Sequence, residues 1–297
     1  MRVTMDDLVG LFPALPTPTD TAGNVDVKAT ARLVDFLCAA GIDGLVPVGG
    51  TGEYAALSPA DRRAMVEATV AAAAGRVPVV AGVLATGFKD AIQAASDFTA
   101  AGAAGLMLVT PYYVTPTQEG IREYFRAFAQ EVTVPVLLYE IPYRTGVALK
   151  AETIAQMADD GSIVGMKACN PDFNQFTRVI QLVGERISVM SGEEPFFATH
   201  VALGARGGIL ATANLFPKVW QEVFALARAG DLKGALARQQ RLLPLLDAAF
   251  AETNPGPLKE AMAMIGLPVG HVLRPLERPR PETMVKLEAA VRAMQES

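Results

Sequence analysis

The chain has 297 residues, of which 51% are hydrophobic and 19% are charged, and its formal net charge is −5. This composition is typical of a globular protein with a large core, and the mild acidity, with no cluster of Lys or Arg, argues against a nucleic-acid-binding surface. No stretch approaches the roughly 20 consecutive apolar residues that a membrane-spanning helix needs, so we expect no membrane partner.

Short apolar segments with the composition of β-strands recur along the chain. They are apolar throughout rather than alternating, which is typical of strands covered on both faces, as in a parallel sheet. Eight such strands are predicted, at residues 11–18, 44–49, 77–84, 105–111, 135–142, 163–169, 187–194 and 207–214.

Helical patterns fill the gaps between these strands. Apolar residues at helical spacing share one face after Ile121 and again after Phe173, and Ser58 and Thr117 are predicted N-caps. Eight strands that alternate with helices predict an α/β fold, the (β/α)8 or TIM barrel. The alternative is an open doubly wound sheet, but no GxGxxG motif opens the first strand-to-helix turn.

The end of the chain changes character near residue 228. Helices are predicted at 231–251, 255–266 and 281–295, separated by prolines. We therefore expect residues 1–228 to form the barrel and residues 229–297 to form a C-terminal helical region packed on it.

Reactive side chains in such barrels lie at the C-terminal ends of the strands. The chemically relevant residues at these positions are Gly50, Thr51, Tyr112, Tyr113, Tyr139, Arg144, Lys167, Gly192, Glu193, Glu194 and Asn214.

Lys167 lies in an apolar strand, where a charged side chain is costly to bury. In one interpretation it reaches solvent, or pairs with Glu193 or Glu194. In the other it is a nucleophile, because desolvation favours the neutral amine, which attacks ketones. Tyr139, one strand away, would handle the proton. An imine with a 2-oxo acid would then act as an electron sink for making or breaking a C–C bond.

The segment "GGTGE" at 49–53 follows the second predicted strand. Its glycines expose backbone N–H groups, which together with the Thr51 hydroxyl suit a carboxylate or a phosphate. A tight turn without a ligand is the other interpretation. Combined with Lys167, the segment predicts a binding site for a 2-oxo acid.

Histidines and cysteines are few. His200 and His271 fall in predicted helical or tail segments, so we expect no Ser-His-Asp triad and no histidine-based metal site. Cys38 lies in a predicted helix, and we expect Cys169 on the other side of its strand from Lys167, as a small buried residue. No disulfide is predicted, and with no signal-like N-terminus we expect a cytoplasmic protein.

The segments "GGTGEYAAL", "VTPYY", "LLYEIPYRTG", "GMKA" and "SGEE", in this order and spacing, resemble the dihydrodipicolinate synthase and N-acetylneuraminate lyase family of Schiff-base-forming barrels. The resemblance extends from "ALPTP" to "NPGPLKEAM" in the helical region. It implies a lyase without cofactor that acts on pyruvate or a related 2-oxo acid and an aldehyde, in a homo-oligomer, either a dimer or a tetramer.

The resemblance also implies roles for single residues. Lys167 matches the lysine that forms the imine, and Tyr139 matches the tyrosine that moves protons. Tyr113 matches a tyrosine that reaches into the site of a neighbouring subunit. Five further residues match or border substrate-binding positions: Gly50 and Thr51 in the carboxylate-binding turn, Arg144 for the second substrate's carboxylate, Ile209 beside pyruvate, and Gly192.

Departures from the family pattern bear more on which substrate the protein uses than on its class of reaction. Gly50 stands where the synthase branch usually has a threonine that links two tyrosines in a proton relay. "GGTGE" also resembles the oxo-sugar-acid dehydratases, although these usually lack the arginine of "YRTG". Pro59 and Arg62 replace the polar or His groups of the lysine feedback site, so we expect no feedback by lysine.

Three interpretations follow. The leading one is an enzyme similar to 4-hydroxy-tetrahydrodipicolinate synthase, which condenses pyruvate with an aldehyde through a Lys167 imine. The alternative within the family is a dehydratase or aldolase of a 2-oxo-3-deoxy sugar acid. The alternative of another class is a non-catalytic barrel that binds 2-oxo acids. A phosphate-binding barrel is disfavoured because Glu193 and Glu194 would repel phosphate.

Overall fold

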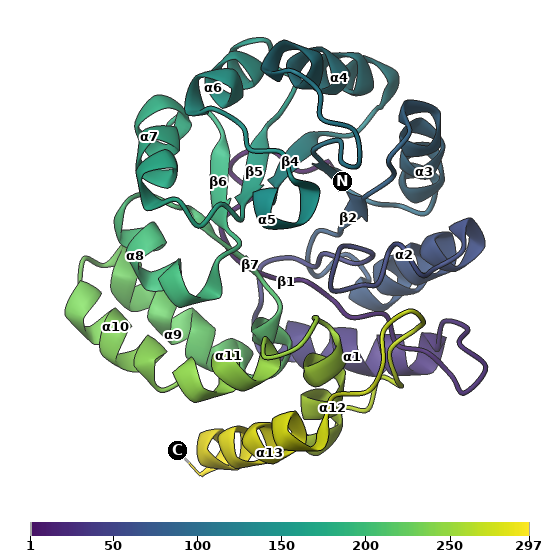
Figure 1. Ribbon diagram of the computed structural model, residues 1–297, viewed down its shortest axis with the longest axis vertical. Helices are drawn as coiled ribbons and strands as arrows, with labels where there is room; N and C mark the ends of the chain where they lie inside the picture. The colour runs from purple at the N-terminus through teal and green to yellow at the C-terminus, as the bar shows by residue number, and fades with distance from the viewer. Residues whose placement is uncertain (1, 297) are drawn as a thin grey trace.

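The computed structural model describes residues 2–296, within which seven strands form one curled parallel sheet inside a ring of helices (Figure 1). The strands are β1 (Gly10–Pro13), β2 (Val80–Val83), β3 (Gly105–Val109), β4 (Val136–Glu140), β5 (Gly165–Ala168), β6 (Ser188–Ser191) and β7 (Gly207–Leu210). Their order in the sheet is β1-β7-β6-β5-β4-β3-β2, so that the first strand pairs with the last.

The predicted strand at 44–49 closes the barrel between β1 and β2 but is reduced to two isolated bridges. Val46 pairs with Ala14, and Leu45 pairs with Val79. Pro47 has no N–H group to continue the ladder, and Val48 has φ +51°, which turns the chain out of the extended conformation. The predicted (β/α)8 architecture is therefore correct, with the second strand too short to form a regular ladder.

Helices cover the outside of the sheet and continue beyond it. They are α1 (Val27–Ala39), α2 (Pro59–Ala73), α3 (Phe88–Ala100), α4 (Gln118–Glu131), α5 (Pro142–Thr145), α6 (Ala151–Asp159), α7 (Phe173–Val183), α8 (Phe197–Ala202), α9 (Pro217–Arg228), α10 (Leu232–Gln240), α11 (Leu243–Ala249), α12 (Gly256–Met264) and α13 (Pro281–Gln295). Two short 3-10 helices, η1 (Glu194–Phe196) and η2 (Thr212–Asn214), follow β6 and β7.

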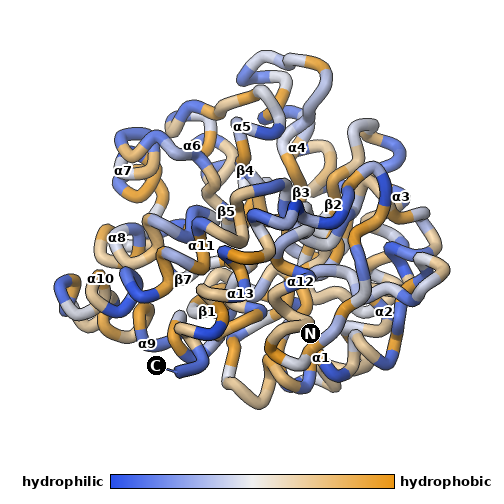
Figure 2. Tube along the Cα trace, turned by 60° about the horizontal axis from the view of Figure 1, so that its bottom comes forward, coloured by the Kyte–Doolittle hydropathy of each residue, from blue (hydrophilic) through white to orange (hydrophobic). Residues whose placement is uncertain are grey.

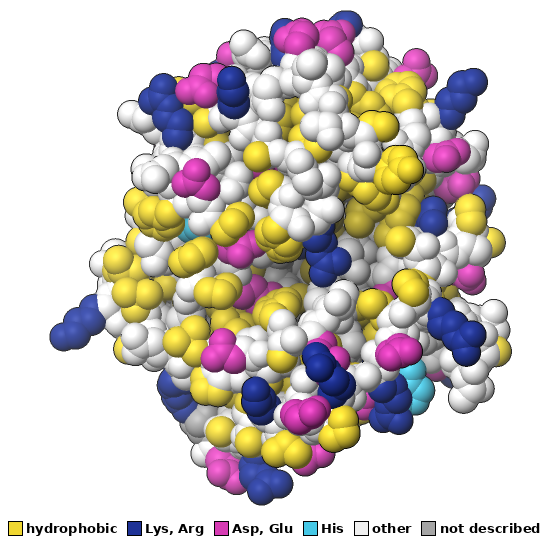
Figure 3. Space-filling model, viewed as in Figure 1, with side chains coloured by type: hydrophobic (Ala, Val, Ile, Leu, Met, Phe, Trp, Pro, Cys, Tyr) yellow, Lys and Arg dark blue, Asp and Glu magenta, His cyan; other side chains and the backbone are white. Residues whose placement is uncertain are grey.

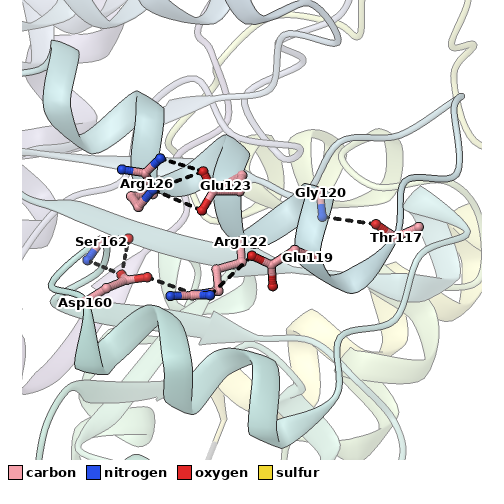
Figure 4. Close-up of polar contacts among 8 residues, drawn as sticks. All are labelled: Thr117, Glu119, Gly120, Arg122, Glu123, Arg126, Asp160 and Ser162. Carbon is pink, nitrogen blue, oxygen red and sulfur yellow. Dashed lines mark hydrogen bonds and ion pairs between the residues drawn. The ribbon is translucent and has the colours of Figure 1, made fainter.

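The helix starts agree with the caps expected from the sequence. The Ser58 side chain accepts a hydrogen bond from the Asp61 N–H at the start of α2, and Thr117 accepts one from the Gly120 N–H at the start of α4 (Figure 4). Arg122 of α4 then joins this helix to the end of α6 through an ion pair with Asp160. Caps of this kind satisfy backbone donors that the first helical turn leaves unpaired.

The core has two layers. Side chains such as Phe12, Met107 and Met190 fill the barrel interior, whereas a larger cluster that includes Met166 and Trp220 lies between the strands and the helices. Along the covering helices, hydrophobic and hydrophilic stretches alternate (Figure 2), as expected for helices with one face on the sheet. Inward and outward positions therefore alternate along each strand, and only the inward-facing side chains can reach the mouth of the barrel.

The helical region after residue 228 forms the four helices α10 to α13, on the side of the barrel next to α9 and α1 (Figure 1). The predicted helix 231–251 is wrong in one respect, because it is interrupted between Gln240 and Leu243, just before Pro244. The division of the chain at residue 228 stays a prediction. None of the helices in residues 2–296 is both long and apolar enough to cross a membrane.

Candidate active site

Lys167 lies on β5 and points into the barrel. Its neighbours Met166 and Ala168 pack in the outer core layer, so strand alternation turns Lys167 inward. Only 8% of the residue is exposed. Tyr139 of β4 is its partner in the sheet register, and the Lys167 Nζ lies 4.7 Å from the centroid of the Tyr139 ring. The amine and the phenol are therefore adjacent, as the sequence predicted.

A cavity of about 600 Å³ opens above these two side chains. The space-filling view shows this face hollowed near its centre, over the ring of strands (Figure 3). The cavity is lined by seven of the residues predicted from the sequence: Gly50, Thr51, Tyr139, Arg144, Lys167, Gly192 and Ile209. The structure thus brings them together from five separate strand ends, while their individual roles stay predictions.

Tyr113 is the predicted site residue that does not line this cavity. It is 96% exposed, and its backbone has φ +75°. Within this chain it has no place at the site, which is the arrangement expected of a side chain that serves a neighbouring subunit.

Two glycines shape the cavity floor. A Cβ on Gly50 would lie 3.8 Å from the Tyr139 hydroxyl oxygen, so this position faces the phenol directly and offers it no side-chain partner. A Cβ on Gly192 would lie 2.1 Å from Cys169 Sγ and 2.9 Å from Lys167 Cε. Any side chain at 192 would therefore displace the lysine.

Burial controls the protonation of the groups around the lysine. It raises the pKa of Tyr139 well above that of a free phenol, so the hydroxyl keeps its proton at neutral pH. Burial also raises the pKa of the Cys169 thiol to about 12, against the opposing effect of the Lys167 charge. Cys169 is thus a neutral thiol rather than a nucleophilic thiolate.

The expectation that Cys169 lies on the other side of its strand from Lys167 is wrong. It lines the same cavity as Lys167, inside the barrel, because residues two apart along a strand face the same side. The expectation that it is buried is correct, and both cysteines are free thiols.

The turn at 49–53 is held by a residue that the sequence pattern does not reveal as part of the site. Asn254, from the helical region, donates a hydrogen bond from Nδ2 to the Thr51 hydroxyl oxygen at 2.8 Å. Since that oxygen accepts a hydrogen bond, its own hydrogen is free to be donated to a ligand. The sequence signal for Asn254 is the segment "NPGPLKEAM", which contributes to the family resemblance but does not by itself connect this residue to the turn.

Two glutamates follow β6, and the structure gives them different environments. Glu194 is buried and accepts hydrogen bonds from the backbone N–H groups of Ala211 and Thr212, which ties η1 to the end of β7. Glu193 lines the cavity, and its Oε1 has no hydrogen-bond partner among residues 2–296. Burial raises the pKa of Glu193, while a hydrogen bond from Tyr143 and the charge of Lys167 act in the opposite direction.

Arg144 extends from α5 at the mouth of the cavity. Its side chain is exposed, and none of the carboxylates in residues 2–296 forms an ion pair with it. A guanidinium without an internal partner is available for an anionic ligand, and its planar fork suits a carboxylate.

His200 lies outside the cavity, stacked on Phe176 with ring centroids 3.6 Å apart and hydrogen-bonded to Ser191. Burial lowers its pKa to about 4, so it is a neutral packed residue, as the sequence suggested. Within residues 2–296, no group of three or more His, Cys, Asp or Glu side chains is arranged to hold a metal ion.

Comparison with known proteins points to one family. The model of the dihydrodipicolinate synthetase family matches residues 7–294. A 4-hydroxy-tetrahydrodipicolinate synthase from Acidiphilium cryptum is 38% identical over 282 residues, which cover 95% of this chain and 97% of that protein. A protein of the same name from Sorangium cellulosum is 39% identical over 290 residues, which cover 97% of this chain and 96% of that protein.

Solved structures agree with this result. The dihydrodipicolinate synthase from Aquifex aeolicus superimposes with a TM-score of 0.93 at 33% identity, over 97% of this chain and 98% of that one. The chloride-inhibited dihydrodipicolinate synthase from Acinetobacter baumannii, complexed with pyruvate, also gives a TM-score of 0.93 at 33% identity, over 97% of this chain and 99% of that one.

Proposed function

Because the chain belongs to the dihydrodipicolinate synthetase family, we propose that it condenses pyruvate with an aldehyde through an imine on Lys167, as a 4-hydroxy-tetrahydrodipicolinate synthase does. The observation that carries this proposal is the placement of Lys167 beside Tyr139 at the floor of a cavity that also presents Thr51 and Arg144. A nucleophile, a proton carrier and two anion-binding groups thus converge from different elements.

The first half of the reaction forms the imine. The pyruvate carboxylate binds the backbone of Gly50 and the Thr51 hydroxyl, which places the keto carbon over Lys167. The amine of Lys167, in its unprotonated form, attacks that carbon, the keto oxygen takes a proton from Tyr139, and the attacking nitrogen returns a proton to Tyr139. The carbinolamine hydroxyl then takes a second proton from Tyr139 and leaves as water, which gives the protonated imine. The protonated state of Tyr139, favoured by burial, suits it to donate first and to recover a proton later.

The second half forms the new bond. The methyl group of the imine loses a proton to the deprotonated Tyr139 to give an enamine, whose carbon attacks the aldehyde carbon. The aldehyde oxygen takes this proton from Tyr139 as the C–C bond forms. Arg144 binds a carboxylate on the aldehyde, which orients it towards the enamine. Hydrolysis, or attack by an amine of the product, then releases Lys167.

Gly50 favours a second candidate within the same class of chemistry. With no hydroxyl at this position, Tyr139 has no side-chain partner there for a proton relay. A dehydratase of a 2-oxo-3-deoxy sugar acid would use the same imine but expel a hydroxyl group β to it, and an aldolase would use it to cleave a C–C bond. Incubation of the enzyme with pyruvate plus aspartate semialdehyde, and separately with 2-oxo-3-deoxy sugar acids, distinguishes the two candidates by their products.

The proposal extends to partners and location. We infer small-molecule partners only. The mild acidity of the chain argues against a nucleic acid, and no stretch reaches the ~20 apolar residues that a membrane span needs. The exposed Tyr113 supports a homo-oligomer, a dimer or a tetramer. The free thiols of Cys38 and Cys169 support a reducing compartment, the cytoplasm.

The proposal predicts that borohydride traps pyruvate on Lys167. Reduction in the presence of pyruvate should add one reduced pyruvyl group to the intact mass of the wild type and none to Lys167→Ala. Lys218→Ala, which removes an exposed lysine on α9, should be labelled like the wild type. Absence of an adduct from the folded wild type with any small 2-oxo acid would leave the non-catalytic binding barrel as the better interpretation.

A further inference from the structure

The turn at 49–53 is connected to the C-terminal helical region by a buried ion pair that the reaction scheme does not use. We propose that the Glu53–Lys259 pair positions this turn for the substrate carboxylate, so that the helical region takes part in substrate selection. The inference rests on the proposed function, since it requires the turn to bind the carboxylate of a 2-oxo acid.

Glu53 ends the turn and points away from the cavity floor towards the helical region. Its Oε1 accepts a hydrogen bond from the Leu273 N–H at 2.6 Å, and its Oε2 lies 2.5 Å from the Lys259 Nζ. Both side chains of the pair are 1% exposed. A single carboxylate is thus bound to two separate parts of the helical region, α12 and the segment that precedes α13.

Lys259 has no other acidic partner among residues 2–296. It lies on α12, and its Nζ also donates a hydrogen bond to the His271 carbonyl oxygen at 2.9 Å. Burial lowers its pKa, while the charge of Glu53 and their hydrogen bond act in the opposite direction. Buried ion pairs contribute little to folding stability, because the cost of desolvating the two charges offsets their attraction. Their geometry, however, fixes one relative position of the two segments that carry the charges. The pair is therefore better suited to fixing a position than to stabilising the fold.

The backbone of the turn needs such fixing. Glu53 has φ +58° and Val48 has φ +51°, a left-handed conformation that is strained for residues other than glycine. Such a conformation persists only where surrounding contacts hold it. Thr17 holds the middle of the turn by donating to the Gly52 carbonyl oxygen at 2.7 Å, and the ion pair holds its end.

The same helical region also contacts the binding atom itself. Asn254 lies just before α12 and donates to the Thr51 hydroxyl, while Lys259 lies on that helix and pairs with Glu53. Residues 51 and 53 of the turn are therefore both oriented by one short stretch of the helical region. Release of Glu53 would shift the turn relative to Lys167 and weaken recognition of the carboxylate. The chemistry of the amine would be affected less.

The test compares pyruvate with methyl pyruvate, which has the same ketone but lacks the negative charge. Adduct formation on Lys167 is followed by borohydride trapping across a range of concentrations of each compound. In the wild type we expect a preference for pyruvate. In Lys259→Met we expect the half-saturating pyruvate concentration to rise by about tenfold or more, with the maximal trapping rate changed by less than about threefold, so that the preference falls accordingly.

Two further variants separate positioning from stability. Leu287→Ala removes a buried side chain from α13 in the same region and should lower the melting temperature without changing the preference for pyruvate. The double variant Glu53→Gln, Lys259→Met removes both charges of the ion pair and keeps an acceptor for the Leu273 N–H. It should fold even where Lys259→Met alone does not, and it should show the same loss of preference.

Three results would contradict the inference or the proposed function. Suppose that Lys259→Met, or the variant that combines it with Glu53→Gln, folds and keeps both the wild-type half-saturating pyruvate concentration and the wild-type preference for pyruvate over methyl pyruvate. That result would overturn the inference and leave the proposed function intact. An equal loss of preference in Leu287→Ala would also overturn it, because general destabilisation would then explain the effect. Absence of any wild-type adduct would overturn the proposed function, and the inference with it.

Discussion

Gly192 shows how closely the residues around the Lys167 amine are packed. The position follows β6, and its missing side chain leaves space that the aliphatic part of Lys167 and the thiol of Cys169 occupy. The sequence marks Gly192 only as a glycine at a strand end. Its role depends on the two neighbours, which come from β5 and the residue just after it and which a single strand pattern does not reveal.

We predict that Gly192→Ala lowers the rate of pyruvate adduct formation by about 100-fold, because the new methyl group displaces the lysine. Adding Cys169→Ala should restore part of the rate, since this removes the sulfur that lies 2.1 Å from the new Cβ. Cys169→Ala alone serves as the control and should trap pyruvate like the wild type. A single Gly192→Ala variant with the wild-type rate would contradict the prediction.

Strand β4 carries two chemically different residues on its two faces. Tyr139 faces the cavity, whereas Glu140 is fully buried on the opposite side, between the sheet and the helices. The Glu140 Oε1 accepts hydrogen bonds from the Leu149 N–H at 3.3 Å and from Asn170 Nδ2 at 3.1 Å. Glu140 thus connects β4 to the chain before α6 and to the chain after β5. Burial raises its pKa to about 7.

This pKa predicts that the contribution of Glu140 to the free energy of unfolding falls as the pH rises from about 4.5 to about 7. In that window the unfolded chain loses the Glu140 proton while the folded chain keeps it, so the free energy of unfolding decreases. Glu140→Gln cannot ionise and should gain up to roughly 3 kcal/mol over the wild type at about pH 8, with little difference at about pH 4.

Urea denaturation of both proteins at several pH values measures this difference. The comparison isolates Glu140, because the other buried carboxyl groups are the same in both proteins. A difference that stays constant from acid to mildly alkaline pH would contradict the assignment.

At the level of elements, the sequence predicts the features that local patterns determine, namely the positions of the strands and the starts of helices. It does not predict features that depend on backbone chemistry or on tertiary contacts. Apolar runs and caps located the strands and the starts of α2 and α4. The run at 44–49 was correctly placed, but Pro47 and Val48 prevent a regular ladder there. Apolar spacing continued across the break before α11, where only Pro244 indicated an interruption.

The site shows the same division. Lys167 and Tyr139 could be found because each stands out at the end of an apolar strand. Asn254 and Lys259 could not be assigned to the site by pattern alone, because they lie far along the chain from the turn they contact, with a separation of 203 residues between Thr51 and Asn254. Only the folded chain brings α12 against the second strand's turn.

At the scale of the whole molecule, Tyr113 is the predicted site residue that the single chain leaves unused. It is almost fully exposed, and a bulky residue with φ +75° is strained unless some contact holds it. Val114 beside it is also exposed. An exposed aromatic residue in a strained turn near the mouth of the barrel is the feature expected at an interface between copies of this chain.

We predict that the enzyme sediments as a multiple of its 31.4 kDa chain mass and that Tyr113 completes the site of a neighbouring subunit. Tyr113→Ala should then keep the pyruvate adduct on Lys167 but lose most of its turnover with the aldehyde. Lys167→Ala should lose both. When the two variants are unfolded together and refolded as a mixture, turnover should reappear, because a mixed dimer contains one site with an intact Lys167 and a Tyr113 supplied by its partner. The control is the summed turnover of the two variants refolded separately. If the mixture does not exceed this sum, Tyr113 acts within its own chain or not at all.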